Sequence, residues 1–147
     1  MVELMPKQNA KGKAIISVVS GNWVSNYTQL SGFIRRSQVY INGGYTVFLV
    51  MHGSQPRYAI NDETEDIKRA VRFVRYNAKL YRIDSARIGI TGASSGGHLA
   101  LMTALADDMI NLKSKDPTDK VSSRVQAAAV FFPPTDFLNW GGPNMKT

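Results

Sequence analysis

A serine between two glycines is the clearest chemical signal in the chain. Residues 92–96 read Gly-Ala-Ser-Ser-Gly, a match to G-x-S-x-G with Ser94 at its centre. This pattern is typical of a sharp strand-to-helix turn that presents a nucleophilic serine above a sheet. Gly92 and Gly96 leave room for the turn, and the Ser95 backbone N–H lies where it can donate to an oxyanion. We predict Ser94 as a nucleophile; the simpler alternative is a structural turn with a capping serine.

The same stretch resembles the T-G-x-x-x-G-x-G turn that holds a dinucleotide in short-chain dehydrogenases. Thr91, Gly92 and Gly96 match, but His98 stands at the third glycine, where the helix must pack closely and the ligand approaches. Two strand-helix units precede the turn, and no tyrosine follows Tyr81 to supply that family's catalytic pair. A short-chain NAD(P)-dependent oxidoreductase is therefore the alternative that we favour less.

A nucleophilic serine needs a base, and the chain offers two histidines. His52 follows a predicted strand and can line the cleft. His98 lies one helical turn after Ser94, but the turn aims the serine away from that helix, so we expect His98 to be structural. Asp136 follows the last predicted strand and is a candidate acid; its alternative is a residue of the cleft wall.

Alternating apolar runs and amphipathic segments must position these residues. Short β-branched or apolar runs predict buried strands at residues 13–19, 45–51, 86–91 and 124–132. Helical segments separate them, which predicts an α/β fold: a three-layer αβα sandwich with a mostly parallel sheet. Functional groups in such sheets gather at the carboxyl ends of the strands. This points to the loops at residues 20–26, 52–60, 92–97 and 133–142.

The charge pattern indicates a solvated helix face rather than a nucleic-acid-binding site. The formal net charge is +7, and many bases follow Asn61 and Asp62, which we expect to cap a helix. These bases are Lys68, Arg69, Arg72, Arg75, Lys79 and Arg82. We interpret them as a solvated face opposite the apolar stripe of Ile67, Ala70, Val71, Val74, Ala78 and Tyr81. We expect residues 109–123 to be a linker that runs over the surface.

Several stretches together resemble the α/β-hydrolase esterases and lipases, especially the feruloyl and acetylxylan esterase branch. RIGITGASSGGHLAL resembles their nucleophile elbow, and AIISVVSGNWVSN resembles the strand and oxyanion loop that often reads H-G-G-G-W. The segments that precede and follow the elbow match in the same order. The resemblance implies oxyanion donors at Gly21 and Asn22, with Ser20 a further candidate. It departs from the family where a histidine would precede the glycines; backbone N–H groups need no particular side chain.

The resemblance implies a serine hydrolase that acts on carboxylic esters through an acyl-enzyme, with neither metal nor organic cofactor. The family places its histidine, and usually its acid, further along than this chain reaches. We therefore expect a single partial domain over residues 1–147, lacking strands at both ends, with MVELMPK the tail of an earlier strand. The expected partner is a small-molecule ester, without nucleic acid and without a membrane span. A non-catalytic module of the same fold, and a peptide substrate, remain alternatives; localisation and oligomeric state stay open.

Overall fold

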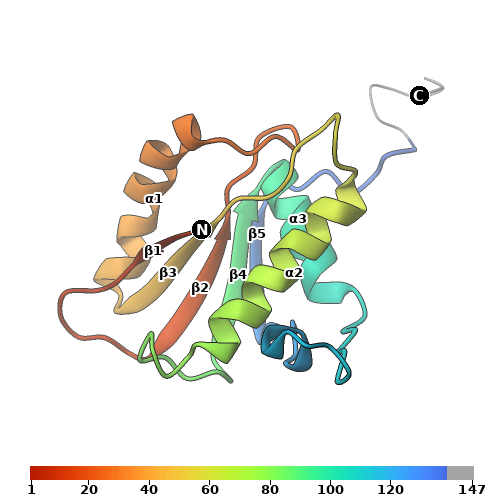
Figure 1. Ribbon diagram of the computed structural model, residues 1–147. Coiled ribbons are helices and arrows are strands. Elements are labelled where there is room, and N and C mark those ends of the chain that lie inside the picture. Colours follow the sequence, from red (N-terminus) through yellow and green to blue (C-terminus); the bar gives the residue numbers. More distant parts are fainter. Residues whose placement is uncertain (139–147) are drawn as a thin grey trace.

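A five-stranded sheet organises the chain in a computed structural model that describes residues 1–138 (Figure 1). The strand order is β1-β3-β2-β4-β5, and only β1 runs antiparallel to its neighbour. The strands are β1 Val2–Leu4, β2 Lys13–Val18, β3 Tyr45–Val50, β4 Ile88–Ala93 and β5 Ala127–Phe131. The predicted α/β class and mostly parallel sheet are confirmed.

Within the described residues, three α-helices make the outer layers: α1 (Leu30–Asn42), α2 (Ile60–Tyr76) and α3 (Ser95–Leu105). Helix α1 covers one face of the sheet, and α2 and α3 pack side by side on the other (Figure 1). Two short 3₁₀ helices, η1 (Tyr27–Gln29) and η2 (Pro117–Lys120), lie in connections. The expected αβα layering is therefore present.

Alternation along the strands divides the core into two layers. In β2, Ile16 and Val18 pack toward α2 and α3, whereas Ile15 packs toward α1. Val47 and Leu49 of β3 share the α1 layer. Successive side chains of a strand point to opposite faces, so a strand covered on both faces must be apolar throughout, as these runs are.

Several predicted boundaries differ from the structure. Strand β4 begins at Ile88 rather than residue 86, because the Arg87 N–H donates to the Asp84 carbonyl in a turn (2.9 Å). Helix α2 begins at Ile60, so Asn61 is not its cap. Asp62 instead accepts from the Ala59 N–H at 2.9 Å, which makes it the third-position half of a capping box.

The interpretation of the basic helix as a solvated face is wrong for its central residues. Lys68 is 5% exposed and Arg72 is 7% exposed. The Lys68 Nζ donates to the Asp107 carbonyl, and the Arg72 Nη2 donates to the Met109 carbonyl. Arg75 likewise donates to the carbonyls of Ser85, Ser122 and Arg124.

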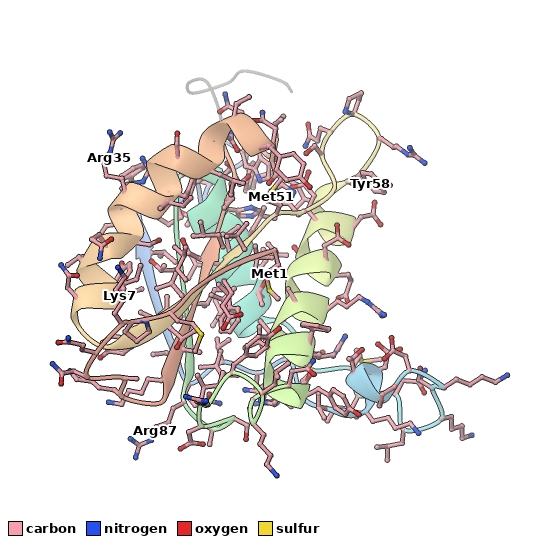
Figure 2. All side chains as sticks on the ribbon, turned by 60° about the vertical axis from the view of Figure 1, so that its left-hand side comes forward. Met1, Lys7, Arg35, Met51, Tyr58 and Arg87 are labelled. Carbon is pink, nitrogen blue, oxygen red and sulfur yellow. The ribbon has the colours of Figure 1, made fainter. Side chains whose placement is uncertain are left out.

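These bonds hold the segment that follows α3, so residues 109–123 are fixed against α2 rather than loose on the surface. Arg69 adds ion pairs to Asp116 and Asp119 around η2. Backbone carbonyls left without strand or helix partners need donors, and long basic side chains provide them. Other bases do point into solvent: Figure 2 shows Arg35 on α1 and Arg87 before β4 directed away from the body of the molecule.

Within residues 1–138, no helix has the length and apolar character needed to cross a membrane. The same residues contain no cluster of three or more side chains suited to holding a metal ion.

Candidate active site

Ser94 occupies a strained junction between β4 and α3. Its backbone has φ 52° and ψ −128°, values that residues with a Cβ rarely adopt. The Ser94 N–H donates to the Phe131 carbonyl of β5 (3.0 Å), and the Ser94 carbonyl accepts from the His98 N–H (3.0 Å). Such strain persists only where the surroundings over-determine it, and it concentrates at active sites. The turn leaves the Ser94 side chain half-buried.

The two glycines of the motif allow this junction to close. A Cβ on Gly92 would lie 2.2 Å from the Gly96 carbonyl oxygen, which is a steric clash, so only glycine fits at this position. A Cβ on Gly96 would lie 3.0 Å from the Val18 carbonyl oxygen of β2. The glycines are therefore required by backbone packing on both sides of Ser94.

Ser95 begins α3, and the first N–H groups of a helix have no partner within the helix. Its side chain is 1% exposed, and its Oγ lies 3.2 Å from the Oγ of Ser20, the residue that follows Val19 after β2. Burial separates the two neighbouring serines: the Ser94 side chain is the accessible one, and Ser95 offers a backbone donor.

The β2 loop (residues 20–26) forms a tight reverse turn beside the elbow. The Gly21 N–H donates to the Val24 carbonyl at 2.9 Å, and the Val24 N–H returns a bond to Gly21 at 3.0 Å. Asn22 and Trp23 between them have φ 51° and 57°. Two successive positive φ angles are the signature of a type I′ turn. The Gly21 N–H is thus engaged within the turn, so the Asn22 N–H is the candidate donor of this loop, although Ser20 and Gly21, and not Asn22, line the cavity beside Ser94.

A cavity of about 790 Å³ opens beside Ser94. Its walls come from α1, the β2 loop, the elbow and the end of β5, and include Gly21, Ser31, Ser94, Phe131 and Phe132. Two phenyl rings and the half-buried hydroxyl suit an acyl or alcohol group with apolar surface. At this cavity the predicted meeting of loops at the carboxyl edge of the sheet is therefore present for the first and third loops, which the end of β5 joins.

His98 is buried on α3 and faces Trp23. The Trp23 Nε1–H donates to the His98 Nδ1 at 3.2 Å, and the two rings meet edge to face at 5.9 Å. Burial lowers the pKa of His98, which disfavours the charged ring. Between residues 1 and 138 no side chain hydrogen-bonds to the Ser94 Oγ, so the His98 ring has no hydrogen bond to the nucleophilic atom.

His52 does not line the cavity; its side chain is fully buried against α2. Its Nδ1 lies 3.6 Å from the Glu63 Oε2 and contacts the Gly53 carbonyl. Among the described residues, neither its Nε2 nor either Glu63 oxygen has a hydrogen-bond partner. Burial, with Asp66 and Asp62 nearby, raises the pKa of Glu63 to about 7, and burial lowers the pKa of His52.

Asp136 lies in the exposed segment after β5, where its Oδ1 accepts from the Leu138 N–H at 3.1 Å. The remainder of the predicted loop, residues 139–142, lies outside the described residues. The geometry here describes a local turn and leaves the role of Asp136 as an acid a prediction.

Sequence reasoning missed two residues that hold the β2 loop. Trp23 served only to align that loop, yet its indole joins the loop to α3. The Ser54 Oγ of the β3 loop (residues 51–59) accepts from the Ser25 N–H at 2.9 Å. The predicted convergence of these loops was a usable signal for such bonds, but it did not identify the pairs.

Comparisons with known proteins place this geometry in a family. The BD-FAE family model matches residues 2–147. The chain is 29% identical over 142 residues to Esterase LipQ of Mycobacterium tuberculosis, covering 93% of this chain and 31% of LipQ. The chain thus spans less than a third of that relative's length.

Two solved structures are similar over 89% of this chain and 48% of theirs, each with a TM-score of 0.72. One is an acetyl ester-xyloside bifunctional hydrolase from Caldicellulosiruptor lactoaceticus, at 28% identity. The other is esterase Est2 of Thermogutta terrifontis with propionate bound, at 27% identity. The chain spans about half of each. It therefore belongs to the BD-FAE family of carboxylic ester hydrolases with the α/β-hydrolase fold.

Proposed function

We propose that this chain carries the nucleophile and the oxyanion donors of a serine esterase. The observation that carries the proposal is the backbone of Ser94, held at φ 52° between β4 and α3 with its side chain at the wall of a cavity. The base is not His52 or His98, because each is engaged elsewhere and neither contacts the Ser94 Oγ. The base therefore comes from outside residues 1–138.

The proposed reaction begins when the Ser94 Oγ attacks the acyl carbonyl carbon. The Oγ–C bond forms, the hydroxyl proton passes to the base, and the carbonyl oxygen becomes an oxyanion. The N–H groups of Ser95 and Asn22 would donate to it; removing one such donor typically costs about 10²–10³ in turnover. The alcohol then leaves with a proton, and water releases the acid from Ser94.

The substrate class that we propose is an ester with a small acyl group. Support comes from two relatives, one described as an acetyl ester-xyloside hydrolase and the other solved with propionate. The aromatic side chains of Phe131 and Phe132 at the cavity agree with an apolar part of the substrate.

Hydrolysis of p-nitrophenyl propionate with added imidazole tests the proposal. The chain alone should have little activity, because no histidine among residues 1–138 is hydrogen-bonded to the Ser94 Oγ. Free imidazole replaces a missing general base, so it should raise Ser94-dependent turnover by about tenfold or more. Ser94→Ala should show only the imidazole background, while Ser31→Ala, at the same cavity, should match the wild-type chain.

Equal rates in the wild-type chain and Ser94→Ala at every imidazole concentration would contradict the proposed function. Robust hydrolysis without imidazole that is lost in a His98 variant would instead show that His98 is the base.

A further inference from the structure

The turn in the β2 loop places residues with side chains in a backbone conformation that they rarely adopt. Both central residues of its turn, Asn22 and Trp23, have side chains and yet lie in the left-handed region. Type I′ turns prefer Asn and Gly at these positions, and tryptophan is neither. Something beyond the turn must therefore fix Trp23, since such a conformation persists only with support from its surroundings.

That support comes from α3. The Trp23 indole is partly buried, donates to the His98 Nδ1 at 3.2 Å, and contacts the rings of His98 and Phe137 with centroids 5.9 and 5.8 Å away. Phe137 also packs on His98, at 5.0 Å. An indole N–H can only donate, so its partner must offer a lone pair. Neutral histidine with its proton on Nε2 does so.

Each of the two residues in this hydrogen bond lies close in sequence to a proposed reacting group. His98 is one helical turn after Ser94, and its backbone N–H bonds the Ser94 carbonyl at 3.0 Å. Trp23 directly follows Asn22, the donor that we favour in the β2 loop. A single bond between the two side chains thus links the nucleophile's helix to the oxyanion donor across 75 residues of sequence.

We infer that His98 is a positioning residue: by accepting the Trp23 indole N–H, it sets the distance between Ser94 and the Asn22 N–H. This inference rests on the proposed function for its catalytic meaning. Transition-state donors act only when they are already in place, so a shift in the β2 loop should lower kcat more than it changes KM.

Hydrogen exchange of the chain itself tests the link. Trp23→Phe removes the donor but keeps a ring, and His98→Leu removes the acceptor. We expect amide exchange in residues 20–26 to rise about tenfold in each, while β2, β3 and β4 stay protected. His98→Asn should keep exchange slow, because the asparagine Oδ1 is bonded to Cγ, as the histidine Nδ1 is, and can accept the same hydrogen bond. Tyr27→Phe, at a side chain 79% exposed just after the loop, is the matched control and should change nothing.

The double variant Trp23→Phe/His98→Leu should exchange no faster than either single variant, since both remove one bond. Wild-type exchange in Trp23→Phe, additive effects in the double variant, or His98→Asn exchanging as fast as His98→Leu would each overturn the inference. Should His98→Leu fail to fold, Trp23→Phe and His98→Asn still decide it.

The imidazole-supported reaction supplies the catalytic readout, in which Trp23→Phe should lower kcat about tenfold with KM little changed. Unchanged kcat in a variant whose loop exchanges faster would overturn the catalytic part. Exchange needs no substrate, so absence of hydrolysis in the wild-type chain counts against the proposed function alone.

Discussion

The two histidines of this chain lie in regions that treat the same side chain in different ways. Both are buried, and burial lowers the pKa of each. His98 faces a neutral indole donor, so its neutral form is fully compatible with its surroundings. His52 faces the carboxyl of Glu63, whose two oxygens have no hydrogen-bond partner among the described residues.

The difference separates a geometric role from a titratable one. Near His98, a ring contact joins α3 to the β2 loop, and both the loop and the elbow have residues with positive φ. Near His52, two ionisable groups share a dry site, where the charged form of either is disfavoured. Histidine at the carboxyl edge of a hydrolase sheet is thus no sign of a catalytic base until its partners are known.

The rigidity of the elbow gives the largest expected effect. Gly92→Ala should lower the free energy of unfolding by about 3 kcal/mol, because its Cβ would meet the Gly96 carbonyl oxygen at 2.2 Å. Gly89→Ala in the same strand is the matched control, since its Cβ would lie 3.5 Å from the nearest atom, the Ala127 carbonyl oxygen. Urea unfolding of both variants makes the measurement. A Gly92→Ala chain as stable as Gly89→Ala would show that the elbow tolerates relaxation.

The His52 region should show a smaller effect that depends on pH. The pKa of Glu63 is raised from 4.5 to about 7, so its contribution to stability is full below pH 4.5 and is lost as pH rises through about 7. Glu63→Gln has no proton to lose. The free energy of unfolding of Glu63→Gln relative to wild type should therefore rise by about 2 kcal/mol between pH 5 and pH 8.

Chemical unfolding at the two pH values measures this difference, with Glu3→Gln as an exposed control that should show no such trend. A Glu63→Gln effect that is the same at both pH values would mean that the carboxyl of Glu63 does not hold its proton on folding, and the contrast between the two histidine regions would disappear.

The alternation of apolar runs with helical segments made the fold predictable from the sequence. Runs such as residues 45–50 are largely apolar on both faces, as expected for a parallel strand that helices cover on both sides. The glycine spacing around Ser94 predicted the elbow. Local rules of this kind act within a few residues. They misplaced the start of β4, because the Arg87 turn depends on a specific bond to Asp84.

What the sequence could not supply were pairings between distant segments. The burial of Lys68 and Arg72 depends on carbonyls of residues 107 and 109, which periodicity does not identify. Trp23, the partner of His98, lies 75 residues away in the sequence. Glu63, the partner of His52, lies in a charged stretch whose composition is typical of an exposed surface. Tertiary contacts override the helix pattern at these positions.

We propose Ser94, and not its neighbour Ser95, as the nucleophile. Treating the chain with a fluorophosphonate in the presence of imidazole and sequencing the modified peptide by mass spectrometry tests it most directly. We expect an adduct on Ser94 in the wild-type chain and in Ser95→Ala, and no adduct in Ser94→Ala. An adduct that persists in Ser94→Ala, or none in the wild-type chain, would contradict it.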